Sequence, residues 1–262
     1  MTTRGYSITG AETRKYIALH PFTILSGRDP ADDAIGPFSV TPNGEVWGQA
    51  PSEIRNRPMT IKRPITDLAF TKRLRTAAMM KTAASKVPWG IICQEIGLRS
   101  IADIQRGLAA IHVETNPLPK DRAILTKITD YCDRQKIFFP IAGSISPTLE
   151  RSIGKILEKL SLASVQVTDE DGFHQLVVES KLFLEPEPLA LELTKHLPKV
   201  ADRALPINWL QSPQDEFEVY VAEGTSYSII SVSDKHIEPF IQTELEGFWC
   251  DPNRTFDWWF TP

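Results

Sequence analysis

The chain of 262 residues lacks the short signatures by which many enzymes and membrane proteins are recognised. It contains no G-x-G-x-x-G or Walker motif, no G-x-S-x-G nucleophile elbow and no Pro-Cys-x-x-Cys zinc half-site. No apolar run reaches the roughly 18 residues of a membrane-spanning helix. The cysteines Cys93, Cys132 and Cys250 are odd in number and far apart. This pattern favours a reducing cytoplasm over secretion, and the polar N-terminus indicates no signal peptide.

The composition is that of a globular protein, but its charge is unevenly distributed. Hydrophobic residues make up 42% and charged residues 24%, and the formal net charge is −4. Residues 1–136 carry 20 Lys and Arg against 13 Asp and Glu, a net +7, whereas residues 137–262 carry 9 against 20, a net −11. Such asymmetry is informative about partners rather than fold. Two interpretations stay open: the halves neutralise each other, or the acidic half faces a basic partner.

Hydrophobic periodicity predicts an α+β fold, in which a helical middle segment packs with a mixed, largely antiparallel sheet of about five strands. Recurrent prolines make residues 1–60 an irregular N-terminal wrap. Residues 61–136 form a basic, helical segment and residues 137–262 form an acidic α+β segment. These two segments can also be parts of one continuous domain. Expected helices cover 66–87, 89–96, 100–111, 119–135, 147–160, 187–196 and 239–247. Expected strands cover 137–141, 164–167, 173–178, 217–221 and 227–232, with an extended segment at 16–20 and a turn at 43–44.

A strand-to-helix turn is the best candidate for a small-molecule site. Gly143, Ser144 and Ser146 precede Pro147, with Ser146 in the N-cap position and Pro147 as the first helical residue. Free N–H groups at a helix N-terminus, with their partial positive charge, suit a phosphate or a carboxylate. Simple capping explains the same residues, and Ser144 as a nucleophile has no identifiable base.

The C-terminal tail is unusually aromatic. Trp249, Trp258 and Trp259 belong to a run of six aromatic residues within thirteen, and Asp251 and Asp257 lie between them. Packed inward, these rings complete the core; partly exposed, they form an interface anchor with acidic flanks.

Other candidates carry weaker signals. His112 and Glu114 are similar to the first half of a zinc deaminase signature, but Cys132 stands alone, so no metal site and no cofactor are expected. The remaining histidines lie on different elements: His20, His174, His196 and His236. One basic cluster, which could hold phosphates, comprises Lys62, Arg63, Lys72, Arg73, Arg75, Lys81 and Lys86. Because interleaved aromatics are missing and the basic residues fall mainly on one solvated helix face, a nucleic-acid partner is not favoured.

Several segments together resemble a family of bacterial proteins described as a domain of unknown function. The matching segments are residues 19–22, 87–98, 139–143, 146–150 and 245–251. The resemblance spans about residues 19 to 259 and leaves the segment before about residue 60 least secured. It brings no established activity and therefore no catalytic residues. It implies a bacterial or phage-like intracellular setting.

The sequence therefore favours a non-catalytic, cytoplasmic binding protein of the immunity or antitoxin type. Its acidic, aromatic surface would bind a basic partner such as a toxin. The alternative is a small-molecule enzyme or ligand-binding protein that uses the turn from Gly143 to Pro147, with His20, His112 or His174 as acid or base.

Overall fold

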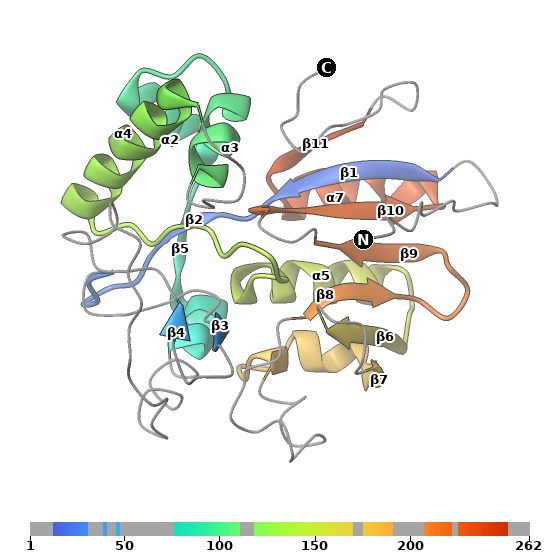
Figure 1. The fold of residues 1–262 in the computed structure, drawn as a ribbon. Helices are drawn as coiled ribbons and strands as arrows, with labels where there is room; N and C mark the ends of the chain where they lie inside the picture. The colour runs from blue at the N-terminus through green and yellow to red at the C-terminus, as the bar shows by residue number, and fades with distance from the viewer. Residues whose placement is uncertain are drawn as a thin grey trace.

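The computed structural model shows a central sheet with helices on its faces (Figure 1). The structure describes residues 13–30, 39–40, 46–47, 76–110, 118–169, 175–190, 207–221 and 225–250. The strands are β1 (Arg14–Leu19), β2 (Phe22–Ile24), β3 (Ser39–Val40), β4 (Val46–Trp47), β5 (Ser85–Val87), β6 (Ser164–Asp169), β7 (Gln175–Glu179), β8 (Ile207–Gln211), β9 (Phe217–Tyr220), β10 (Tyr227–Val232) and β11 (Gly247–Trp249). The helices are α2 (Trp89–Ile96), α3 (Ile101–Ala109), α4 (Pro119–Gln135), α5 (Pro147–Lys159), α7 (Glu238–Glu244) and the 3-10 turns η2 (Ser180–Phe183) and η4 (Lys235–Ile237).

Seven strands form the main sheet, in the order β11-β1-β10-β9-β8-β6-β7. Each neighbouring pair in this sheet is antiparallel. The predicted α+β class is confirmed, and strands β6, β7, β9 and β10 lie where the alternating patterns indicated. Strands β8 and β11 were not predicted. Two further strand pairs, β2 with β5 and β3 with β4, stand outside the main sheet.

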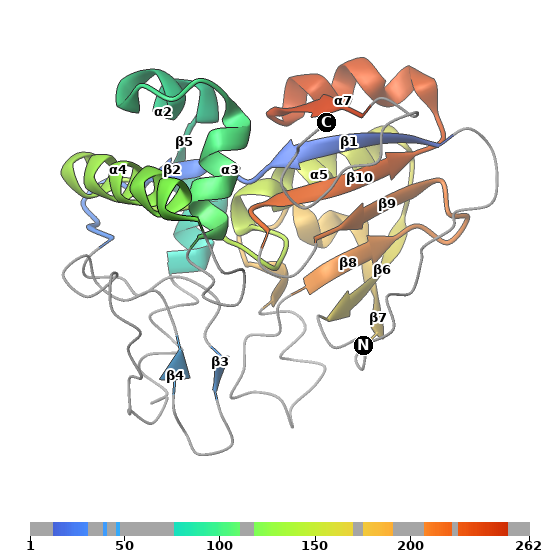
Figure 2. The same ribbon diagram turned by 45° about the horizontal axis from the view of Figure 1, so that its top comes forward.

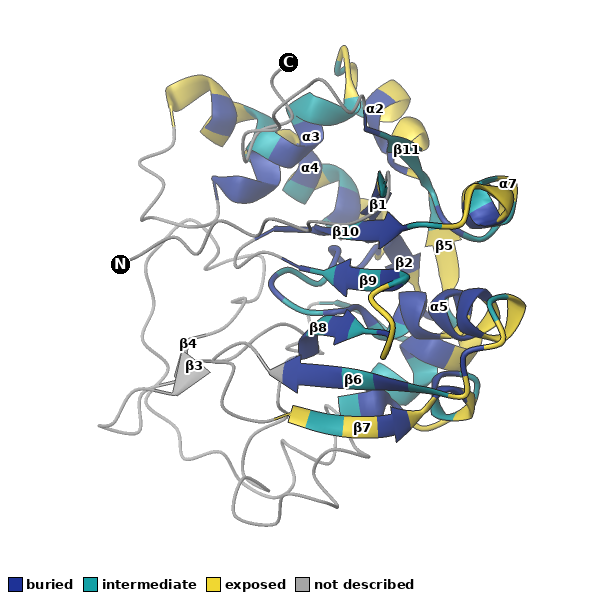
Figure 3. Cartoon of the chain, turned by 90° about the vertical axis from the view of Figure 1, so that its right-hand side faces the viewer, coloured by how far each residue is buried: buried dark blue, intermediate teal, exposed yellow. Residues whose placement is uncertain are grey.

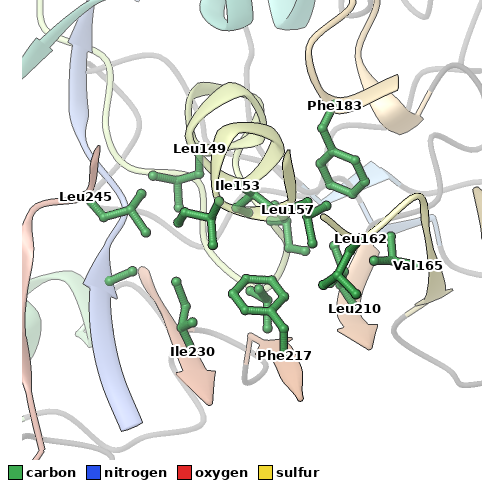
Figure 4. Packing of buried hydrophobic residues seen from close by; sticks show 14 of the residues in the cluster. Leu149, Ile153, Leu157, Leu162, Val165, Phe183, Leu210, Phe217, Ile230 and Leu245 are labelled. Atoms are coloured by element: carbon green, nitrogen blue, oxygen red, sulfur yellow. The ribbon is translucent and has the colours of Figure 1, made fainter. Parts of the chain in front are cut away.

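Helix α5 covers one face of the sheet and forms the larger core with it. Leu149, Ile153 and Leu157 repeat at helical spacing and are buried there (Figure 4). They pack with alternate strand residues such as Phe217 and Ile230, because side chains on a strand point to opposite faces in turn. Helix α7 contributes to the same core.

The helices α2, α3 and α4 form a group beside one end of the sheet (Figure 2). A second core joins them to the opposite sheet face, since Ile17 and Leu19 of β1 are buried together with Trp89, Ile104 and Ile128. The helical segment and the sheet therefore share a hydrophobic core.

Two predictions at the junction were wrong. The helix expected over 66–87 ends at residue 83 in the described part of the chain, and Ser85–Val87 instead pairs with Phe22–Ile24 as a strand. Pro88 disfavours a helical conformation at Val87, the last residue of the predicted helix. Residues 137–141 form no strand but a single bridge between Thr23 and Phe138, and Pro140 has no N–H to extend a ladder.

Most of the other helix boundaries were predicted closely. α2 follows Pro88 and ends at Gly97, whose φ of 67° is the left-handed conformation that glycine adopts easily. The capping box of α3 joins Ser100 and Asp103, as the sequence indicated. The helix expected over 187–196 lies mainly outside the described residues, as does the turn at 43–44.

Candidate functional site

His20 lies at the junction between the sheet and the helical group, completely buried. Its Nδ1 is 2.5 Å from the carbonyl oxygen of Ile141, and its Nε2 is 2.7 Å from the hydroxyl oxygen of Ser228. A carbonyl only accepts hydrogen bonds, so Nδ1 carries the proton and Nε2 accepts from Ser228. Burial lowers the pKa of His20 from 6.5 to about 4, against a smaller opposing effect of the bond to Ile141. His20 is therefore neutral at physiological pH.

The backbone of His20 connects the same elements. Its N–H donates to the Ser226 carbonyl at 3.0 Å, and its carbonyl accepts from the indole N–H of Trp89 at 2.7 Å. Through its side chain and backbone, this one residue joins β1, the start of β10, helix α2 and the segment before α5. In the sequence, His20 lies in the matching segment 19–22 and is one of three candidate acid or base residues, but no local pattern shows which groups it contacts.

The predicted turn lies directly after Ile141, and its backbone is already hydrogen-bonded. Gly143, at a φ of 73°, donates its N–H to the Thr225 carbonyl at 3.0 Å, and Ile145 donates to the Ile207 carbonyl at 2.7 Å. Ser146 occupies the N-cap position as predicted, but its side chain is buried and shares a hydrogen bond of 2.7 Å with the hydroxyl of Thr148 instead of bonding to a helix N–H. Two N–H groups near the predicted anion site thus already have acceptors.

The hydrogen bonds around His20 link the same kinds of groups as the catalytic site of a serine hydrolase, but solvent does not reach them. A hydroxyl, an imidazole that accepts from it and a group that orients the imidazole are the parts that activate a nucleophile. Here His20 and Ser228 are both 0% exposed, and the lowered pKa of His20 makes it a weak base. We therefore assign these bonds a structural role, in which they hold β1 and β10 to the segment before α5.

A buried ion pair joins the basic and acidic halves of the sequence. Lys81 Nζ lies 2.7 Å from Glu150 Oε2 and also donates to the carbonyls of Leu182 and Glu187, at 3.1 and 2.7 Å. The N–H of Leu189 donates to the same carboxylate at 3.0 Å. Burial raises the pKa of Glu150, and the neighbouring Lys81 opposes that rise. Lys81 is consequently not available to a phosphate.

Of the other members of the predicted basic cluster, Lys86 lies in the described part of the chain. Lys86 Nζ lies 3.2 Å from the hydroxyl of Ser152, and burial lowers its pKa while the charge of Glu244 opposes the shift. The remaining five lie outside the described residues: Lys62, Arg63, Lys72, Arg73 and Arg75.

Trp249 is the described member of the predicted partner surface. It lies half-buried in β11, with its ring centroid 5.0 Å from that of Tyr16 and 5.1 Å from the guanidinium carbon of Arg14. Arg14 also pairs with Glu238 at 2.6 Å, a second contact between the two halves. The other predicted tail residues lie outside the described part: Asp251, Asp257, Trp258 and Trp259.

Strand β7 forms one edge of the sheet and is largely exposed (Figure 3), with carboxylates at its C-terminal end and in the segment that follows. Val177 is 68% exposed, a high value for a large hydrophobic side chain. Glu179 pairs with Lys181 at 2.5 Å, and both side chains are mostly in solvent. The hydrogen bond and charge of Glu179, together with the nearby charge of Glu185, raise the pKa of Lys181. Glu185 and Glu187 are also exposed. The sequence pattern predicted this strand but not its position at an edge.

The remaining sequence candidates are not assembled into a site in the described part. His112, Glu114 and His174 lie outside it, and Cys132 is buried between the helices. Within the described ranges, no group of three or more His, Cys, Asp or Glu side chains is placed to hold a metal ion. No helix in those ranges is long and apolar enough to cross a membrane.

Comparison with known proteins gives one match. Neither the curated proteins nor the solved structures contain a significant match to this chain. The model of one family matches residues 59–260, which is more than half of the chain and begins where the proline-rich wrap was expected to end. The chain therefore belongs to the family described as "Protein of unknown function (DUF2711)".

Proposed function

We propose that the chain is a non-catalytic binding protein of the immunity or antitoxin type, which covers a basic surface on a partner protein such as a toxin. The observation that carries this proposal is the exposed acidic edge of the sheet, where Glu179, Glu185 and Glu187 stand in solvent with Lys181 beside them. Carboxylates placed in this way attract a cationic partner and speed its capture.

The ion pairs described above between the two halves involve carboxylates other than those at the β7 edge. Glu150 and Glu238 pair with Lys81 and Arg14 from the basic half. Glu179 pairs within the acidic half, with Lys181, so that contact does not reduce the acidic excess of residues 137–262. In the described part of the chain, the side chains of Glu179, Glu185 and Glu187 are exposed.

The closed polar cluster supports a role in binding rather than catalysis. His20 and Ser228 have the chemistry of a nucleophile and a base, but both are completely buried. The cysteines Cys93, Cys132 and Cys250 are free thiols, which is consistent with the cytoplasmic, bacterial setting that we infer.

The test is capture of a partner from the source bacterium with the full chain as bait. We expect the chain to retain a protein rich in Lys and Arg, and salt to weaken the interaction. The bait variant Glu179→Lys/Glu185→Lys should lose that protein. The matched variant Glu95→Lys/Asp130→Lys, with the same charge change on exposed positions of α2 and α4, should keep it. Retention of no basic protein, or equal loss with both variants, would overturn the proposal.

A further inference from the structure

We propose that the partner binds by strand addition, with a basic, extended segment that joins the main sheet beside β7. This inference rests on the proposed function for the charge of the partner. The site itself follows from the backbone of the edge strand Gln175–Glu179. Strand addition is an established mode of peptide recognition, in which main-chain bonds give affinity and side chains give specificity.

The register of β7 shows which backbone groups point outward. The N–H of Ser180 donates to the Ala163 carbonyl at 2.9 Å, in line with the antiparallel pairing of β7 and β6. Hydrogen-bonded and non-hydrogen-bonded pairs alternate along such a ladder. Leu176 and Val178 therefore bond to β6. The N–H and C=O groups of the intervening residues point away from the sheet, and these residues are Gln175, Val177 and Glu179.

The edge lacks the usual protection against strand addition. Natural edge strands are commonly shortened, bulged or interrupted by proline and lysine. The β7 sequence Gln-Leu-Val-Val-Glu contains neither proline nor lysine, and its register with β6 runs without a shift from Ser164 to Thr168. At its centre, Val177 is 68% exposed. An added strand would cover this side chain and pair with the backbone on either side of it.

Charge selects a basic segment over a second copy of the chain. Glu179 and the exposed Glu185 lie at one end of β7. A second copy paired antiparallel with Val177 opposite Val177 would place Glu179 opposite the neutral Gln175 and would bring no cation to these carboxylates. A segment with cations flanking an aliphatic residue fits instead, because its cation lies opposite Glu179 when the aliphatic residue lies opposite Val177.

The test uses the full chain and a fluorescein-labelled peptide, Thr-Lys-Thr-Val-Thr-Lys-Thr, capped at both ends. Fluorescence anisotropy measures binding to the wild type and to four variants. Val177→Pro removes an outward N–H and leaves the ladder to β6 intact, whereas Val177→Thr keeps the N–H and the β-branched shape. Glu179→Lys reverses the charge at the edge. Glu158→Lys makes the same reversal at an exposed position of α5.

We expect Val177→Pro to weaken binding of the peptide at least about tenfold and Glu179→Lys at least about fivefold, with Val177→Thr and Glu158→Lys within about threefold of the wild type. A peptide N-methylated at its valine and lysines should not bind, because methylation removes the amides that face β7. The thermal unfolding midpoint of each variant establishes that it is folded.

Two outcomes overturn strand addition: the peptide fails to bind the wild type, or it binds Val177→Pro and the wild type equally. These outcomes differ from failure of the proposed function. If the bait retains a basic protein and Val177→Pro retains it equally, strand addition is wrong and the function stands. If the peptide binds as expected but no basic protein is retained from the bacterium, β7 accepts a strand and the proposed function is wrong.

Discussion

Replacing Lys81 by methionine tests whether the buried pair with Glu150 holds the two halves of the chain together. Methionine fills a similar volume but removes the ammonium group, which lies 2.7 Å from Glu150 and donates to two backbone carbonyls. Glu150 would keep the bond from the Leu189 N–H and lose its counter-charge. A buried carboxylate without a cation is strongly disfavoured.

The expected loss is about 3–5 kcal/mol in the free energy of unfolding, the usual cost of removing one partner from a buried pair. Most of that cost comes from the charge left behind. The double variant Lys81→Met/Glu150→Met should therefore recover most of this loss, with a remaining deficit from the Leu182 and Glu187 carbonyls and the Leu189 N–H, which lose these partners.

The assay is unfolding in urea followed by tryptophan fluorescence. Lys155→Met provides the control, since Lys155 pairs with Glu244 at 2.9 Å with its side chain about half exposed, and it should cost less than about 1 kcal/mol. The deficit of Lys81→Met should also shrink as pH falls. Loss of the cation raises the pKa of Glu150 further, and an acid whose pKa is higher in the folded state favours folding at low pH. Equal losses for Lys81→Met and Lys155→Met would refute this reasoning.

Three further perturbations follow from individual contacts. His20 has a pKa near 4 in the folded chain and about 6.5 in the unfolded chain, so between these pH values only the unfolded chain binds the extra proton. The free energy of unfolding should therefore fall by about 2 kcal/mol from pH 7 to pH 5. Urea titrations at both pH values would measure this fall, and His20→Gln should lack it. A Cβ at Gly247 would overlap the Ile17 carbonyl oxygen, so Gly247→Ala should lower the free energy of unfolding by more than about 2 kcal/mol. A Cβ at Gly90 in α2 meets open space, so Gly90→Ala should raise it by up to about 1 kcal/mol. A reversed order of the unfolding midpoints of these two variants would contradict this expectation. Glu246 accepts the Trp89 N–H at 2.9 Å at the start of α2, so Glu246→Ala should cost about 1 kcal/mol in urea unfolding, and no loss would show that this carboxylate does not cap the helix.

Local sequence patterns predicted those helices and strands whose ends or buried faces are determined by a few neighbouring residues. Proline at the first position fixed the starts of α4 and α5, and Gly97 marked the end of α2. Alternation identified β9 and β10 because one face of each is buried against α5. The run at 137–141 has the same hydrophobicity but pairs with a strand only at Phe138, through a single bridge, and composition alone could not show this.

The candidate sites depend on contacts between distant residues, which no local pattern encodes. His20 meets Ser228 and Ile141, more than a hundred positions away in each case. The sequence placed Lys81 in a cluster of basic residues, and only the packing of the helical residues 76–83 shows that its side chain turns inward to Glu150. The charge totals of the two halves indicated a basic partner, but the position of β7 at the sheet edge comes from the strand order.

The most direct measurement of the central claim is the salt dependence of binding between the purified chain and any protein that it retains from an extract of the source organism. The account predicts a basic protein whose affinity falls steadily as salt rises and falls further when Glu179 and Glu185 are reversed to lysine. An acidic or neutral protein, held with an affinity that neither salt nor these reversals changes, would contradict it.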